Sequence, residues 1–223
     1  MPVAAVSKAK RSSVLTKAKA KLEPMRDAER TKRALLDAAE IEFAAKGLAG
    51  ARVDVIAEES APTSGCPIIK DLYMAVLERA YGAMRERERE LNFTNLEPLD
   101  AIRTLVEFKF DYYVAHPRII PLLAAENMTG GKYLKRSRRL RDMHLSLIDM
   151  IRKVLASGER QGVIKPGIDP FQLYVSFSAL SYFYFSNAAT LSTAFGRELM
   201  SEAERKARRA HAVKVIIFYV KVQ

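Results

Sequence analysis

The placement of proline and glycine most constrains the fold of this chain. These residues fall between long runs in which apolar side chains recur every three or four positions, and no alternating strand pattern is sustained. Pro98 and Pro170 stand at predicted helix starts, and His116-Pro117 ends a helical run, because proline is tolerated in the first helical turn but not in the interior. The sequence therefore predicts an all-α protein.

The first predicted helix begins at the N-cap residue Asp27 and ends at Gly47. Its apolar residues recur at helical spacing and are expected to face a small core: Leu35, Leu36, Ala39 and Phe43. A short second helix is expected to offer Val53, Ile56 and Ala57 to the same core. A helix from Asp71 is expected to add Leu72, Val76, Ala80 and Met84. This last helix continues into an alternating charged run, 85–90, which we expect to be solvated. Further helices are predicted at about 98–115, 118–128, 137–161, 170–190 and 202–222.

Charge and cysteine content narrow the function classes. The formal net charge of +11 predicts a polyanionic partner, either nucleic acid or an acidic membrane surface. The single cysteine, Cys66, excludes an internal disulfide and fits a reducing cytoplasm, which is the predicted location. Neither the spacing of Cys and His nor the three histidines indicate a metal site, so no metal or cofactor is expected. No nucleophile, base and orienting group form a catalytic constellation, so the chain is not expected to be an enzyme.

The uncharged segment from Phe171 to Phe195 is long enough to span a membrane. Its serines, its tyrosines and Asn187 lower the hydropathy, so we expect a helix that is buried on two sides and no membrane insertion.

The first 26 residues are polar and basic, with seven basic side chains against the single acid Glu23. We expect them to be disordered alone, because they hold too few apolar residues to offset the entropy of ordering. Two interpretations stay open. The segment is a solubilising tail or a product of a misassigned start codon, or it is an arm that follows DNA phosphates or enters the minor groove.

Three strings resemble the TetR family of transcriptional repressors, namely TKRALLDAAEIEFAAKG (31–47), ARVDVIAEES (51–60) and DLYMAVLERAYGAM (71–84). The resemblance implies a homeodomain-like helix-turn-helix domain over 27–84. A C-terminal helical effector-binding and dimerisation domain is implied over 85–223. In this family the second helix crosses the DNA backbone and the third, the recognition helix, enters the major groove.

The segment APTSGCPIIK (61–70) departs from the family pattern at the recognition helix. It is about five residues too short, lacks the aromatic pair that holds the family's recognition helix in place, and contains Pro62 and Pro67, which leave room for one helical turn. One hypothesis is a one-nucleotide slip after Ser60. Residues 61–66 can be encoded as GCG CCA ACA AGC GGA TGC. With one G restored in front, that string encodes Gly-Ala-Asn-Lys-Arg-Met, which resembles a TetR turn and recognition-helix start. The alternative is a genuine divergent loop.

The resemblance places Arg52 at the start of the second helix, close to phosphate, and Lys70 near a family lysine that faces phosphate just before the fourth helix. The predicted DNA-binding residues are Lys8, Lys10, Arg11, Arg52, Thr63, Ser64 and Lys70.

The string LLAAENMTGGKYLKRS (122–137) resembles the effector domain of one TetR branch. An effector pocket in a helical domain is mostly apolar with a few convergent polar groups. The candidates are Phe110, Tyr113, Glu126, Asn127, His144, Ile148, Tyr174, Phe177 and Asn187, each with a plain core or surface position as its alternative. The basic run from Lys132 to Arg141 either attracts an anionic effector or forms a solvated helix start.

An apolar stripe on the last helix predicts helix–helix packing. The candidate dimer-interface residues are Tyr182, Ala210, Val213, Ile217 and Val220. Two helices from each subunit would form an intersubunit four-helix bundle, and the alternative is that both pack inside one subunit.

Together these features predict a homodimeric repressor that binds double-stranded DNA at a pseudo-palindromic operator and is released by a small-molecule effector. The alternative is a dimerising or ligand-binding TetR-like protein that has lost sequence-specific DNA binding.

Overall fold

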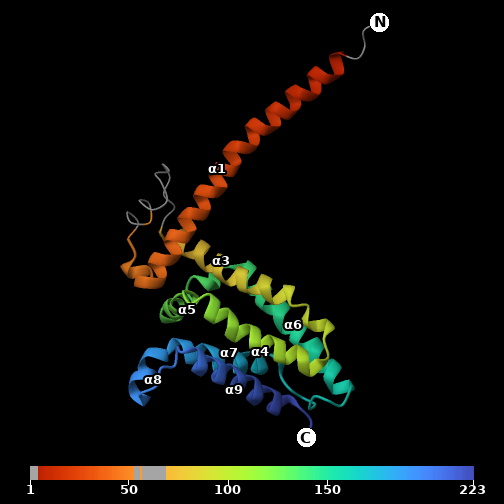
Figure 1. Cartoon of the computed structure of the whole chain (residues 1–223), viewed down its shortest axis with the longest axis vertical. Coiled ribbons are helices and arrows are strands. Elements are labelled where there is room, and N and C mark those ends of the chain that lie inside the picture. Colours follow the sequence, from red (N-terminus) through yellow and green to blue (C-terminus); the bar gives the residue numbers. More distant parts are fainter. Residues whose placement is uncertain (1–4, 53–55, 57–68) are drawn as a thin grey trace.

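The computed structural model describes the backbone of residues 5–52, 56 and 69–223, and the side chains of residues 28–52, 56 and 69–223. In this part of the chain the structure is helical throughout, with no named β-strand and a single isolated bridge between Ile164 and Lys221. Helix α1 extends away from a bundle formed by the helices that follow it (Figure 1). The prediction of an all-α protein is confirmed.

The described helices are α1 (Ala5–Gly50), α3 (Ile69–Glu90), α4 (Pro98–Ala115), α5 (Ile119–Met128), α6 (Arg138–Arg160), α7 (Pro170–Ser186), α8 (Ala188–Phe195) and α9 (Glu202–Val220), with short 3₁₀ turns at Phe93–Asn95 and Leu134–Arg136. The predicted starts at Pro98, Pro170 and Glu202 are confirmed. Side-chain caps account for two of them, because Asp169 accepts a hydrogen bond from the backbone N–H of Gln172 (2.9 Å) and Ser201 accepts one from Glu204 (3.4 Å). The helix expected over 170–190 is instead divided at Asn187 into α7 and α8.

The N-terminal segment differs from the expectation of a disordered arm, because α1 begins at Ala5 and passes through the predicted start at Asp27. Alanine and lysine are abundant before Glu23, and both are strong helix formers that extend an existing helix at little cost. The predicted end at Gly47 is confirmed as a break, since Gly47 has a left-handed φ of 65°.

The second helix predicted at 53–60 lies outside the described residues apart from Ile56, which is helical and buried.

A small core joins α1 to α3 and includes Ile56. Ala39, Phe43 and Tyr73 are fully buried in it, and Leu35 and Leu36 pack at its edge, as their helical spacing predicts. The edge of the Phe43 ring meets Tyr73 at 5.1 Å between centroids, and Tyr73 meets Tyr133 in the same way. Tyr133 lies just before α6, so this core reaches beyond the predicted domain boundary at residue 84, which falls inside the continuous helix α3.

The main core lies among α4, α6, α7 and α9, which run side by side in the lower part of Figure 1. Helix α7 buries Leu173, Phe177, Ser181 and Tyr184, but Phe183 on its other face is 56% exposed. The helix is therefore buried on one side of this chain rather than on two. Within the described residues, no helix is both long and apolar enough to cross a membrane.

The Tyr73 hydroxyl supplies a stability test of the N-terminal core. It is buried without a hydrogen-bond partner, and burial raises the pKa of Tyr73 to about 12. Because an unsatisfied buried hydroxyl costs about 1–3 kcal/mol, Tyr73→Phe should raise the free energy of unfolding, measured by chemical denaturation. Tyr182→Phe, which changes a half-buried side chain whose hydroxyl is not among the buried unpaired atoms, is the matched control and should have little effect. A Tyr73→Phe protein less stable than wild type would contradict this assignment.

Candidate functional site

Three charged side chains lie inside the C-terminal domain. Arg85 and Glu88 extend from α3, and Lys109 extends from α4; they are 3%, 1% and 1% exposed. The pattern 85–90 predicted a solvated helix end, and the structure shows this prediction to be wrong for Arg85 and Glu88. Their spacing of three residues puts both on the face of α3 that meets α4, whereas Arg87 and Glu90 stay in solvent.

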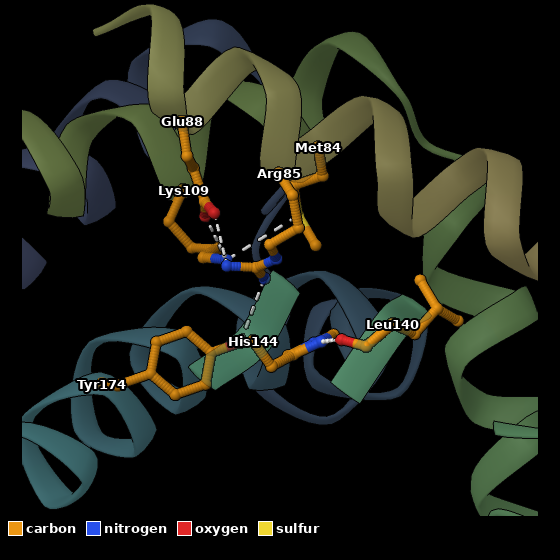
Figure 2. A network of polar contacts seen from close by, with 7 residues as sticks. All are labelled: Met84, Arg85, Glu88, Lys109, Leu140, His144 and Tyr174. Atoms are coloured by element: carbon orange, nitrogen blue, oxygen red, sulfur yellow. Dashed lines mark hydrogen bonds and ion pairs between the residues drawn. The ribbon is translucent and has the colours of Figure 1, made fainter. Parts of the chain in front are cut away.

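Glu88 is the centre of this network, as Figure 2 shows. One carboxylate oxygen accepts a hydrogen bond from Lys109 Nζ at 3.0 Å, and the other accepts one from Arg85 Nη1. Arg85 Nη2 donates to the hydroxyl of Tyr174 on α7 at 3.1 Å, so the network connects three helices. Two cations therefore share one carboxylate in a region that excludes solvent.

The surplus of positive charge acts on the neighbouring rings. Burial by itself raises the pKa of Tyr174, but the charges of Lys109 and Arg85 outweigh burial, and the pKa lies below its usual value. Burial and then the charge of Arg85 lower the pKa of His144 on α6. His144 Nδ1 lies 2.6 Å from the carbonyl oxygen of Leu140, which can only accept a hydrogen bond. The neutral ring therefore carries its proton on Nδ1 and presents Nε2 as an acceptor.

A small cavity of about 190 Å³ reaches this network between α3 and α6. Its lining residues are Arg85, Arg89, Asp142, Met143, Ser146 and Met150. Arg85 is the member that belongs to both the cavity and the buried network. In the described part of the chain, no group of three or more His, Cys, Asp or Glu side chains is placed to hold a metal ion.

The nine predicted effector residues divide into three groups. Four of them lie near the network or in the main core beside it. Tyr174 is hydrogen-bonded to Arg85, and Phe177 packs against the Tyr174 ring. Ile148 packs on the main core, and burial together with the charge of Arg85 lowers the pKa of His144. Phe110 and Tyr113 are buried and both contact the ring of Phe185.

Glu126, Asn127 and Asn187 do not join the site. Glu126 is buried, but its carboxylate accepts hydrogen bonds from the backbone N–H groups of Tyr133 (2.8 Å) and Leu134 (2.9 Å), so it holds the turn before α6. Asn127 is exposed, and Asn187 bonds a carbonyl at the end of α7. The basic side chains between Lys132 and Arg141 are exposed, in agreement with a solvated helix start.

Sequence analysis missed Arg85, Glu88 and Lys109. Lys109 was the available signal, because it lies within the apolar sequence of α4, whose neighbours Leu105, Val106 and Phe110 are all buried. A lone lysine on a buried helix face requires a partner, and the alternating run at 85–90 was the place to look for one.

Of the predicted DNA-binding residues, two have described side chains. Arg52 is exposed just after α1, and its backbone N–H donates to Glu42 at 3.1 Å. Lys70 is exposed in the first turn of α3 rather than before that helix. The side chains of Lys8, Lys10 and Arg11, and the whole of Thr63 and Ser64, lie outside the described residues, as does the recognition segment up to residue 68.

Arg79 ties α3 to α1. Its guanidinium donates to Asp37 (2.6 Å), to Glu40 (2.5 Å) and to the backbone carbonyl of Leu36 (3.0 Å). Farther along the chain, the Ser137 hydroxyl that caps α6 donates to Glu78 at 2.5 Å. Helix α3 therefore contacts α1 and the start of α6 at adjacent positions, and it carries Arg85 and Glu88 two turns later.

The predicted dimer stripe faces its own subunit. Val213 and Val220 are buried in the main core, Ile217 packs against it, and half-buried Tyr182 lies beside Tyr113. Only Ala210 is exposed. Along α9 the solvent-facing apolar side chains are one or two positions away, at Val215, Phe218 and Tyr219.

An apolar groove of about 570 Å³ lies between α7 and α9 and includes Val215 and Tyr219. Its apolar lining is Ala179, Leu180, Phe183, Val215, Ile216 and Tyr219. Phe183 and Tyr219 are each at least half exposed, which is unusual for neighbouring large apolar side chains on one surface.

The buried network predicts unequal losses of stability when its carboxylate or one of its cations is removed. Glu88→Gln leaves both cations buried without a carboxylate and should cost about 3–5 kcal/mol of unfolding free energy. Lys109→Met keeps one cation and one carboxylate and should cost much less, because methionine matches the apolar stem of lysine in length. Urea denaturation of both variants measures the difference. Equal losses would show that Lys109 is not a surplus charge.

Comparison with known proteins supports the same architecture. Residues 98–216 match the family model described as the tetracyclin repressor-like C-terminal domain. The chain is 30% identical over 171 residues to the HTH-type transcriptional repressor NicS of Pseudomonas putida. The aligned region covers 74% of this chain and 81% of that protein. It is 32% identical over 145 residues to the HTH-type transcriptional repressor SCO4008 of Streptomyces coelicolor, covering 64% of this chain and 72% of that one.

Solved structures share the fold at lower identity. The transcriptional regulator SCO4942 of Streptomyces coelicolor superposes with a TM-score of 0.64 at 22% identity, covering 85% of this chain and 98% of that one. The ketosteroid regulator KstR2 of Mycobacterium tuberculosis superposes with a TM-score of 0.63 at 16% identity, covering 89% and 96%. The family match, the identity to curated repressors and the helical fold agree, and the chain belongs to the TetR family of transcriptional regulators.

Proposed function

We propose that this protein is a homodimeric DNA-binding repressor that leaves its operator when a small molecule binds the C-terminal domain. The observation that carries the proposal is the 30% identity to a curated HTH-type repressor over 74% of the chain, a length that exceeds the C-terminal domain. The net charge of +11 supports a polyanionic partner. In a pseudo-palindromic operator, two such modules dock on half-sites about one helical turn apart.

The contacts of α3 supply a route for release. Arg79 fastens α3 to α1, and Glu78 receives the hydroxyl that caps α6. A ligand beside Arg85 and His144 would contact α3 and α6 together, and a change in their relative position would move α1 with them. The ligand must bind one arrangement more tightly than the other, because otherwise it shifts no equilibrium.

The apolar groove between α7 and α9 supports a homodimer through these two helices. A second copy related by a two-fold axis would place its own α7 and α9 against the groove and form a four-helix bundle. Phe183 and Tyr219 line this groove and are each at least half exposed, and Arg208 is the one charged residue in its lining. The proposed interface replaces the stripe at Val213, Ile217 and Val220.

Phe183→Glu should convert the dimer to a monomer, because it would place one carboxylate from each copy in a groove whose lining is mostly apolar. Light scattering should give about twice the chain mass of 25.0 kDa for wild type and the single mass for the variant. Leu145→Glu on α6, which changes an equally exposed apolar side chain away from the groove, is the control and should stay dimeric. A dimeric Phe183→Glu protein would place the interface elsewhere.

Gel-shift titration of full-length protein tests DNA binding. The DNA upstream of its own gene should bind at least about a thousandfold more tightly than unrelated DNA of the same length, and the affinity should fall steeply with salt as phosphate contacts release counterions. Equal, weak binding to both fragments would instead identify a TetR-like protein without sequence-specific recognition. The nucleotide sequence across codons 51–73 accompanies this test, since restored nucleotides after Ser60 would bring back the turn and the start of the family's recognition helix.

A further inference from the structure

The buried network holds more positive than negative charge. Arg85 and Lys109 are ion-paired to the same carboxylate, that of Glu88, and the structure places no second acidic side chain against either cation among the described residues. A buried charge that no opposite charge balances is costly, so a protein that retains one has a reason other than stability.

The same cations have hydrogen-bonding capacity left over. Arg85 Nε is buried and has no partner, although the side chain is only 3% exposed. Lys109 Nζ has Glu88 as its oxygen partner and otherwise lies 3.7 Å from the thioether of Met84, a weak acceptor. Both groups can donate to a further acceptor, and an anionic acceptor would also balance the charge.

The cavity between α3 and α6 gives access to Arg85. At about 190 Å³ it accommodates a small organic molecule rather than a drug-sized one. Two other charged residues, Arg89 and Asp142, also line it; both are exposed, and Arg89 is ion-paired with Glu86. Met143 and Met150 supply an apolar and adaptable wall.

We propose that Arg85, with the charge support of Lys109, binds the carboxylate of a small monoanionic effector; this inference rests on the proposed function and gives its effector a chemical class. One unbalanced positive charge selects a monoanion, because a phosphate dianion would replace the positive surplus with a negative one. The ring centroid of Tyr174 lies 5.6 Å from the Arg85 guanidinium carbon, and Figure 2 shows His144 close to both residues. The cavity wall formed by Met143 and Met150 can take the aromatic or short aliphatic body of such an effector.

Thermal unfolding with defined probes tests the site without DNA. Full-length protein is titrated with sodium acetate, butyrate and benzoate, each against its neutral amide and against sodium chloride at equal ionic strength. Benzoate at a hundredfold excess over its Kd should raise the Tm by about 5 °C or more, and benzamide should not. Lys109→Met should weaken carboxylate binding at least tenfold, whereas Lys153→Met, which removes an exposed lysine of α6, should bind as wild type does.

The outcomes separate this inference from the proposed function. If none of the three carboxylates increases the Tm of wild type by more than it increases the Tm of Lys109→Met, the anion site is rejected. The gel shift on upstream DNA then still decides the repressor function. If benzoate stabilises wild type but not Lys109→Met, the anion site stands. In that case an unchanged gel shift in saturating benzoate would reject release by this site and leave the anion binding intact.

Discussion

The contact on which the C-terminal domain depends is the ion pair that Glu88 forms with both Arg85 and Lys109. It brings α3 and α4 together at their apolar faces, and the bond from Arg85 to Tyr174 adds α7. Because the three charges are almost fully buried, their electrostatic interaction is screened far less than that of a surface pair. The three helices are therefore linked by charged groups to which water has little access.

Helix α3 joins the two parts of the molecule through contacts of different kinds. Arg79 forms a half-exposed network with α1 that water and salt can weaken, and Arg85 forms a buried one with α4 and α7. The aromatic series Phe43, Tyr73 and Tyr133 continues the N-terminal core to the turn before α6. A displacement of α3 relative to α6 must therefore disturb polar and apolar contacts together, which makes intermediate positions unfavourable.

The exposed apolar side chains of α7 and α9 form the second feature of the C-terminal domain. Helix α7 has large apolar side chains on both faces, but this subunit buries one face only. Helix α9 adds Val215 and Tyr219 to the exposed side, so the two helices line one largely apolar groove. An exposed apolar groove of this size is typical of an interaction surface, and the proposed dimer would cover it with a second copy of the chain.

The sequence by itself determined the helical class, most helix starts and the N-terminal core, because these depend on local signals: Pro170 within a first turn, Ser201 as a cap, and Ala39 and Phe43 at a helical repeat. It also determined the family, since the strings around Phe43 and Tyr73 are local patterns.

Only the tertiary structure decided which charges are buried and which stripe faces out. Arg85 and Arg87 are indistinguishable in an alternating run, and they separate because α4 packs against one side of α3. Val213 and Val215 are equally apolar, but the rotation of α9 on α4 and α7 sends one into the core and the other to the surface. Such rotations are set by the packing of several helices at once, and no local pattern encodes them.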